Sequence, residues 1–262
     1  MGERRRITLM DMPIDAITER DAVAHILAEL QSGVGGWVIT PNLDQLRQFV
    51  KKPEVQRYYA EASLVLADGM PLVWAGWILG RRLPERVPGS AMIWSLTAGA
   101  AREGRSIFLL GGNEGSAAAA AEELLAKHPD LKVAGTYCPP VGFEKDAGQM
   151  ELIRERLREV RPDIVYVGLG FPKQEKVIEE VRGELPGAWF LGIGVSFSFV
   201  SGEIGRAPAW MQRLGMEWMH RLVQEPKRLF KRYVVQGLPF AAQLFWYAVL
   251  RRVRGESTGR RS

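Results

Sequence analysis

The chain has 262 residues, of which 47% are hydrophobic and 25% charged, with one cysteine and a formal net charge of +5. This composition is typical of a globular protein with a sizeable core, and it excludes disordered and disulfide-stapled classes. The single cysteine, Cys138, cannot form an internal disulfide and fits a reducing compartment. Residues 1–6 are basic, but no long apolar stretch follows them, so no secretory signal is expected.

Short apolar runs alternate with helical patterns along most of the chain. Residues 7–17 are expected to form a strand pair that turns at 11–13, and Thr18 is expected to cap a helix that ends at Leu30. The elements expected after it are, in chain order, a strand at 37–40, a helix at 43–61 with a break before Pro53, a strand at 64–68, a short helix at 70–79, a helix at 90–102 capped by Ser90, a strand at 106–110, a helix at 116–127, a strand at 131–137, a helix at 147–160, a strand at 163–167, a helix that ends at Arg182, and a strand at 189–193.

This alternation favours an α/β fold: a mostly parallel, Rossmann-like sheet with helices on both faces. Residues 1–205 are assigned to this sheet domain. Residues 206–262 are assigned to a helical, basic C-terminal appendage.

The appendage differs in character from the rest. Trp210, Leu214, Trp218 and Leu222 recur every four residues, which predicts an amphipathic helix. Residues 221–262 contain ten basic and two acidic residues, a net charge of +8, so the first 220 residues carry −3. Such a tail points to a polyanion: nucleic acid, lipid phosphate or an anionic membrane surface.

Residues 234–250 carry no charge and have basic residues on both flanks. A membrane-spanning helix needs about 20 apolar residues, and this stretch is shorter and contains Gly237 and Pro239. We therefore expect it to lie in a membrane interface, which suits its aromatic side chains. The alternative is a helix packed on the protein body or in a dimer interface, so a homo-oligomer is left open.

The stretch 64–71 ends an apolar run with Asp68, Gly69 and Pro71. Uninterrupted Val and Leu suit a buried parallel strand, and open α/β sheets bind ligands at the carboxyl ends of their strands. Asp68 is therefore either a ligand-facing carboxylate or the cap of the next helix.

Glycine-rich turns follow three further strands, at 111–115, 168–170 and 192–194. Glycine lets the backbone approach a phosphate, although tight strand–helix packing more often explains a single such turn. Three of them at successive strand ends favour a nucleotide-sized ligand. The histidines are scattered and no Asp-x-Asp occurs, so neither a metal site nor a cofactor is predicted, and Arg86 and the basic tail would have to neutralise any phosphate.

Several motifs occur in a characteristic order: Thr40–Asn42, Ala67–Pro71, Arg86–Ser90, Gly168–Glu175, Arg206–Pro208 and Glu217–Pro226. Together they resemble the WecG/TagA/CpsF glycosyltransferase family over about residues 7–235. The resemblance implies a peripheral, metal-independent, inverting enzyme at the cytoplasmic face of the bacterial inner membrane. Its donor would be a UDP-sugar of the N-acetylmannosamine or glucose type. Its acceptor would be an undecaprenyl-diphosphate-linked sugar for cell-surface polysaccharide, and nucleic acid is not an expected partner.

The resemblance also assigns roles to single residues. Asp68 matches the family's proposed base, Thr40 and Asn42 match pocket residues beside it, and Arg86 and Gln174 match residues needed around the sugar and diphosphate. The expected UDP-sugar contacts are Gly111, Gly112, Asn113, Gly170, Phe171, Pro172, Lys173, Glu175 and Gly194. The basic positions of the appendage that reach the site are matched by Arg221, Arg228 and Lys231.

The chain departs from the family pattern in three places. Lys231 stands where an arginine is expected, so either Lys231 or Arg232 serves the diphosphate. The 137–143 loop reads Cys-Pro-Pro-Val-Gly, and the last strand is expected to run on through 196–199, with Ser198 where an Asp is common. Both segments are expected on the donor side, which leaves the donor sugar open.

Two other function classes remain. A nucleotide-dependent oxidoreductase would also use a Rossmann-like sheet, but no G-x-G-x-x-G fingerprint opens this chain. A non-catalytic membrane-bound scaffold would use the basic tail alone and would be indifferent to substitution of Asp68 and Gln174.

Overall fold

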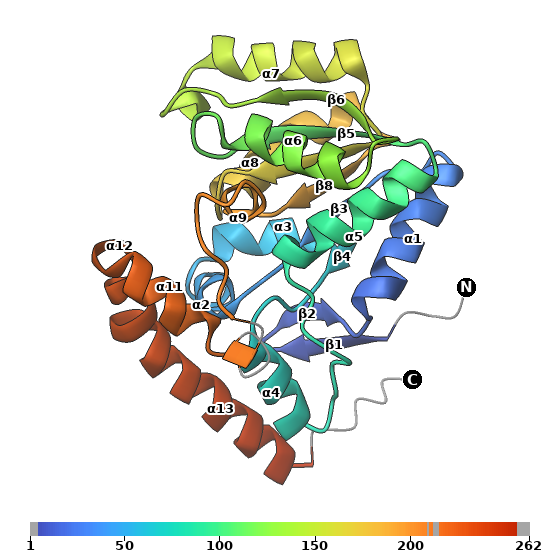
Figure 1. The fold of residues 1–262 in the computed structure, drawn as a ribbon. Helices are drawn as coiled ribbons and strands as arrows, with labels where there is room; N and C mark the ends of the chain where they lie inside the picture. The colour runs from blue at the N-terminus through green and yellow to red at the C-terminus, as the bar shows by residue number, and fades with distance from the viewer. Residues whose placement is uncertain (1–4, 209, 212–214, 256–262) are drawn as a thin grey trace.

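A computed structural model describes residues 5–208, 210–211 and 215–255 of the chain. Its centre is a six-stranded parallel sheet with the strand order β4-β3-β8-β7-β5-β6 (Figure 1). The strands are β3 (Gly36–Ile39), β4 (Leu64–Val65), β5 (Ser106–Gly111), β6 (Lys132–Tyr137), β7 (Ile164–Gly168) and β8 (Trp189–Gly192). β3, β5, β7 and β8 are almost wholly buried, as their uninterrupted apolar sequences predict.

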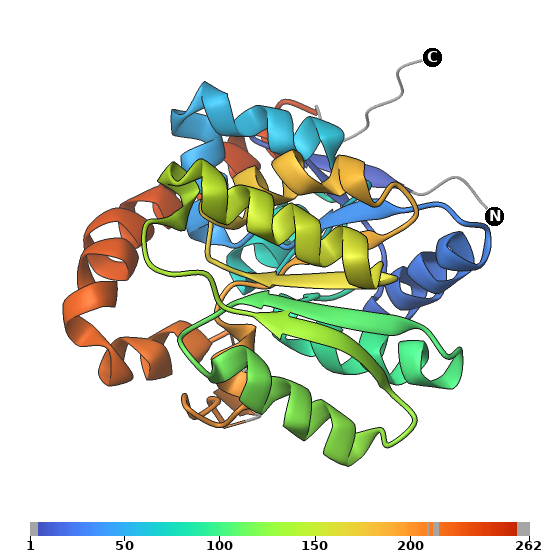
Figure 2. The same ribbon diagram turned by 90° about the horizontal axis from the view of Figure 1, so that it is seen from above.

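Helices cover both faces of the sheet, and Figure 2 shows the sheet between the two helical layers. One core cluster joins the sheet to α1 (Glu19–Gln31), α5 (Gly89–Arg102), α6 (Ser116–Lys127) and α9 (Ser196–Val200). The opposite cluster holds α2 (Leu43–Lys51), η1 (Pro53–Val55), α3 (Gln56–Glu61), α4 (Met70–Ile78), α7 (Ala147–Val160) and α8 (Lys173–Val181). The short turns η2 (Phe143–Lys145) and η3 (Arg182–Glu184) adjoin α7 and α8. The predicted fold class is therefore confirmed.

A separate antiparallel hairpin, β1 (Arg6–Leu9) and β2 (Met12–Asp15), packs beside β4. Asp15 is 3% exposed, and one oxygen of its carboxylate accepts a hydrogen bond of 2.8 Å from the Val65 N–H. Arg6 forms an ion pair with the same carboxylate at 3.0 Å. The hairpin thus fixes the short edge strand that leads into Asp68, since a buried carboxylate keeps its hydrogen-bond partners.

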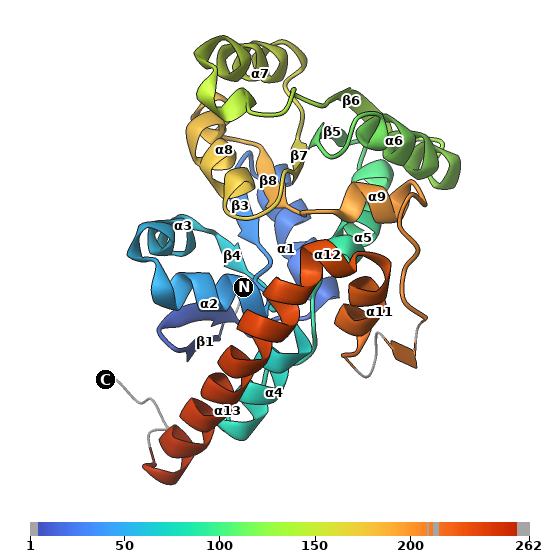
Figure 3. The same ribbon diagram turned by 90° about the vertical axis from the view of Figure 1, so that its left-hand side faces the viewer.

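The C-terminal segment lies beside the carboxyl ends of the strands (Figure 3). It consists of α11 (Glu217–Gln224), α12 (Pro226–Phe230), the π-helical stretch η4 (Lys231–Gly237) and α13 (Leu238–Val253). Residues 226–253 form one helix of 28 residues with a mean hydropathy of 1.2 in its most apolar window, long and apolar enough to cross a membrane by length and composition alone. α13 packs along α4 and α2 and buries Phe240, Leu244 and Ala248, so one of its faces lies on the protein body.

Three local expectations were wrong. Ser90 does not cap a helix: α5 begins one residue earlier with Pro88 at its cap, and the Ser90 hydroxyl accepts a hydrogen bond from Arg206. Residues 196–199 do not extend the last strand, because Gly194 adopts a φ of +56° and the chain enters α9. The Trp210–Leu222 pattern is not one helix, because Gly215 has a φ of +69° and α11 begins after it; Leu214 lies outside the described residues.

Candidate functional site

A cavity of about 720 Å³ opens at the carboxyl ends of β3, β4, β7 and β8. Its floor is made by the loops that follow these strands, and α11, α12, η4 and α13 supply the opposite wall. This is the position at which open α/β sheets bind their ligands, because several loops and helix starts converge there. Most of the predicted site residues line this one cavity: Thr40, Asn42, Asp68, Arg86, Gly170, Phe171, Pro172, Lys173, Gln174, Gly194, Arg221, Arg228 and Arg232.

Asp68 lies at the foot of the cavity, just after the edge strand β4. Its backbone N–H donates to the carbonyl of Pro41 at 2.9 Å, which joins the β4 loop to the β3 loop. Its carboxylate is free of any helix-capping bond to α4, whose first turn has no side-chain cap. The side chain is 29% exposed, and that exposure opens into the cavity it lines. The alternative that Asp68 is a helix cap is therefore wrong.

Arg86 stands between two carboxylates. Its Nη1 atom donates to Glu217 Oε2 at 2.9 Å and lies 3.8 Å from Asp68 Oδ1. Burial raises the pKa of Asp68 to about 7; Arg86 opposes this rise, Glu217 adds to it, and Arg221 and Arg206 oppose it further. A carboxyl group that titrates near neutral pH suits general base catalysis, since it can accept a proton and release it again.

The wall contributed by the C-terminal helices is basic. Arg221 is 19% exposed, stacks over the Phe199 ring at 5.6 Å and lies 4.0 Å from Glu225. Arg228 forms an ion pair with Glu225 at 2.6 Å, and Arg232 one with Asp44 at 3.0 Å. Arg221, Arg228 and Arg232 all line the cavity, an arrangement that can hold an anionic diphosphate.

Of the two residues that compete for the third basic position, only Arg232 lines the cavity. Lys231 is exposed and is not among the lining residues. The geometry therefore favours Arg232 over Lys231 for the predicted contact with a diphosphate.

Thr40 and Asn42 follow β3. The Thr40 hydroxyl is buried and donates to the Gly192 carbonyl at 3.4 Å. The Asn42 side-chain oxygen accepts from the N–H groups of Asp44 and Gln45, which completes a capping box at the start of α2. Both residues line the cavity, and both are also used to build the loop that forms it.

The first glycine-rich turn does not line this cavity. A side chain at Gly111 would meet Leu169, and one at Gly112 would meet Ser116 and then Phe197. The side-chain amide of Asn113 approaches Ser198 at 3.5 Å and Glu203 at 3.4 Å instead. Packing against neighbouring loops thus explains these glycines, and their contact with a donor stays a prediction.

Glu175 is also outside the cavity lining. It is 0% exposed on the inner face of α8, and burial raises its pKa to about 7, opposed by a hydrogen bond from Gln174. Gln174 itself is 2% exposed and reaches the cavity floor.

The sequence reasoning missed two charged residues of the cavity, Asp44 and Glu217, and gave no role to its apolar wall. Glu217 precedes Arg221 by four residues, so the two share a face of α11, and this spacing could have revealed it. The apolar wall is formed by Met70, Trp74, Leu238, Ala241 and Phe245, where α4 meets α13. In the sequence, these residues cannot be distinguished from the other apolar residues of the same two helices, which pack in the core.

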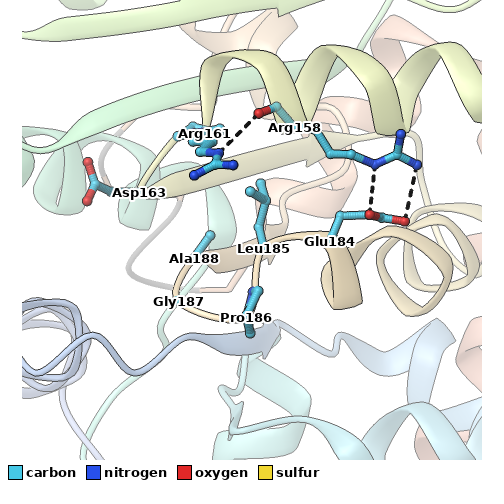
Figure 4. Close-up of a pocket in the computed structure, with 9 residues that line it drawn as sticks. Arg158, Arg161, Asp163, Glu184, Leu185, Pro186, Gly187 and Ala188 are labelled. Carbon is cyan, nitrogen blue, oxygen red and sulfur yellow. Dashed lines mark hydrogen bonds and ion pairs between the residues drawn. The ribbon is translucent and has the colours of Figure 1, made fainter.

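A second hollow of about 490 Å³ lies at the opposite ends of the strands, before β7 and β8 (Figure 4). Arg158 spans it to reach Glu184 with a hydrogen bond of 2.8 Å, and Asp163 is held by Ser106 and Arg105. Arg158 and Glu184 pair with each other, Asp163 is held by residues outside the hollow, and the hollow contains none of the predicted site residues. The predicted site residues thus gather at the 720 Å³ cavity and not at this hollow.

The described residues contain no group of three or more His, Cys, Asp or Glu side chains that could hold a metal ion. Metal independence of the reaction stays a prediction.

The sequence matches a model of the glycosyl transferase WecG/TagA/CpsF family over residues 7–254. It is 30% identical over 195 residues to the N-acetylglucosaminyldiphosphoundecaprenol N-acetyl-beta-D-mannosaminyltransferase of Bacillus subtilis (strain 168), covering 74% of each chain. The protein of the same name from Bacillus spizizenii (strain ATCC 23059 / NRRL B-14472 / W23) is 29% identical over 207 residues, covering 79% of this chain and 78% of the relative. The carboxylate and arginine cavity thus lies in a chain that belongs to the WecG/TagA/CpsF family of glycosyltransferases.

Proposed function

We propose that this enzyme transfers a sugar from a UDP-sugar to an undecaprenyl-diphosphate-linked sugar, for cell-surface polysaccharide synthesis. The donor is of the N-acetylmannosamine type, since the relatives are N-acetylmannosaminyltransferases acting on an N-acetylglucosaminyl-diphosphoundecaprenol. A glucose-type donor is the alternative within the same mechanism. The single observation that carries the proposal is the pairing of Asp68 with Arg86 in a cavity whose far wall bears arginines.

The proposed reaction is a single displacement with inversion. The Asp68 carboxylate takes the proton from the acceptor hydroxyl as that oxygen attacks the anomeric carbon of the donor. The bond from this carbon to the β-phosphate oxygen breaks, and UDP leaves with the electron pair. A positioned base supplies roughly 10²–10⁴-fold of the rate.

Charge on the departing diphosphate is balanced by guanidinium groups in this proposal. Arg86 is near enough to Asp68 to serve the same reacting centre, and Arg221, Arg228 and Arg232 line the opposite wall. Preorganised cations in a cavity from which water is excluded stabilise developing negative charge strongly, because they need no reorganisation during the reaction.

The proposed donor specificity is tested by ligand-induced thermal stabilisation. Saturating UDP or one UDP-sugar should raise the Tm, because binding adds RT ln(1 + [L]/Kd) to the free energy of unfolding, about 2.7 kcal/mol at a hundredfold excess over Kd. The shift should persist in EDTA if no metal is required. Stabilisation by NAD(P) in place of UDP would instead favour an oxidoreductase, and a shift lost in EDTA would refute metal independence.

An anionic membrane surface is the proposed partner of the C-terminal helices. Trp246, Val249 and Val253 are exposed on the outer face of α13, with Trp77 of the adjoining α4 half exposed. Basic residues follow at 251–254. An apolar face with a basic border suits the interface of a bilayer that contains anionic lipid, where the lipid-linked acceptor resides.

Binding to vesicles tests this surface. Replacing Trp246 and Val249 by serine should lower partitioning onto phosphatidylglycerol-containing vesicles by tenfold or more, because each large apolar side chain contributes about 1.5–3 kcal/mol on burial. Val141→Ser, which removes a fully exposed valine from a loop distant in sequence, is the matched control. Equal co-sedimentation of all three proteins would exclude this surface as the membrane contact.

A further inference from the structure

The loops after β7 and β8 are joined by one side chain. The Gln174 Oε1 atom accepts a hydrogen bond from the Gly170 N–H at 3.1 Å and another from the Gly194 N–H at 3.0 Å. Gly170 and Gly194 both line the cavity and belong to different loops. A single amide oxygen therefore bridges two parts of the cavity floor just beyond the paired strands β7 and β8.

The direction of the Gln174 amide is fixed at both ends, by the two glycine N–H groups and by Glu175. The Gln174 Nε2 atom donates to Glu175 Oε1 at 2.9 Å. A carboxylate accepts hydrogen bonds but donates none, so it selects the orientation in which the NH₂ group points toward it and the oxygen toward the loops. The opposite orientation would place an NH₂ group against two backbone N–H donors.

Neighbouring residues leave room for this arrangement. A Cβ at Gly192 would lie 2.4 Å from Gln174 Nε2 and 3.1 Å from Glu175 Oε1. Glu175 is completely buried, and its second oxygen has no hydrogen-bond partner among the described residues. Burial of a carboxyl group costs free energy, and this one is outside the cavity lining. A positioning role accounts for this cost.

We propose that Glu175 is a positioning residue that orients the Gln174 amide, and that Gln174 acts by holding the β7 and β8 loops in register rather than through contact with the sugar. The proposal rests on the glycosyl transfer proposed above only for its activity assay. A misplacement of about 1 Å in such a site can reduce the rate roughly 100-fold.

Exchanging the two side chains provides the test. In Gln174→Glu, two buried carboxyl groups face each other, and they can coexist only by sharing a proton. Burial raises the pKa of Glu175, and this variant also lacks the Gln174 hydrogen bond that lowers it, so the shared proton is lost and the defect should deepen as the pH rises into the alkaline range. In the double variant Q174E/E175Q, the new amide donates to the new carboxylate, which can still accept from both glycine N–H groups.

We expect Q174E to lose about 10–100-fold in kcat in alkaline buffer, and the double variant to recover to within about fivefold of wild type. Glu175→Gln alone keeps the acceptor for Gln174 and should retain most activity, whereas Glu175→Leu should not. Glu180→Gln, an exposed carboxylate on the same helix, is the matched control and should be unchanged.

Hydrogen exchange supplies a readout that does not depend on catalysis. The Gly170 and Gly194 amides should exchange faster in Q174E and E175L, and return to wild-type protection in the double variant. A folded double variant that restores this protection but stays as inactive as Q174E would overturn the proposal, because Gln174 would then act on the substrate through its own amide. Failure of the proposed reaction would instead leave the wild type inactive with these protection differences intact.

Discussion

Asp68→Asn is expected to reduce transfer by about 10²–10⁴-fold, because the amide cannot accept the proton of the acceptor hydroxyl. The substitution keeps the size of the side chain and its place after β4. It should therefore leave UDP binding almost unchanged. Single-turnover rates with a lipid-linked acceptor, measured beside the UDP-induced Tm shift, separate these two effects.

Stability provides the internal control for this variant. Because the pKa of Asp68 is raised to about 7 from 3.8, the folded state holds its proton more tightly than the unfolded state between these values. The free energy of unfolding therefore falls as the pH rises from about 4 to about 7, and the destabilising effect of the ionised Asp68 is complete above pH 7. Removing the charge should raise the Tm in alkaline buffer and change it little below pH 4. A variant that is folded, binds UDP and transfers at near-normal rates would refute the role of Asp68.

Arg86→Gln is expected to cost about 10²–10³-fold in kcat/KM, the loss that follows when one preorganised donor to a developing anion is removed. Arg86 also lowers the pKa of Asp68, so its loss should move the acidic limb of the pH profile of kcat/KM to higher pH. In the wild type this limb should lie near pH 7, with activity rising as Asp68 ionises.

Glu217→Gln should move the same limb in the opposite direction. Glu217 raises the pKa of Asp68, so neutralising Glu217 should lower that pKa. Glu217 also accepts a hydrogen bond of 2.9 Å from Arg86, and weakening this interaction should strengthen the attraction between Arg86 and Asp68. Glu85→Gln, which neutralises an exposed carboxylate next to Arg86 in sequence, is the matched control and should leave the limb in place. Limbs of R86Q and E217Q that coincide would show that neither group governs the base.

The sheet was predictable because its strands carry local signals. Buried parallel strands read as unbroken apolar runs, and the helices between them have recognisable caps, such as Thr18 before α1. The strand order was not predictable in the same way. β8 lies between β3 and β7, and the amino acids at 189–192 do not indicate which strands β8 pairs with.

The sequence predicted correctly that the Asp68 carboxylate and the arginines line the site, but it could not show whether the glycine-rich turns do. Asp68 follows an apolar run, and both Asp68 and Arg86 belong to recognisable motifs, so their residue types indicated chemistry. Gly111 and Gly112 carry the same local pattern as a phosphate-binding turn, yet the spaces beside them are filled by Leu169 and Phe197. A glycine in the sequence indicates that something lies close to the backbone, but it does not show whether this is a ligand or a neighbouring side chain. Only the packed structure distinguishes the two.

Residues on both sides of the domain boundary predicted at residue 205 determine the pKa of Asp68. Glu217 and Arg221, which shift the proton affinity of Asp68, come from α11, while Asp68 follows β4. A protein built from the first 205 residues would expose this carboxyl group to water, where its pKa would return toward 3.8. The pH optimum of chimeras between members of the family should accordingly depend on both parents. Exchange of the C-terminal segment alone should change the pKa of Asp68, although no residue near Asp68 in sequence is altered.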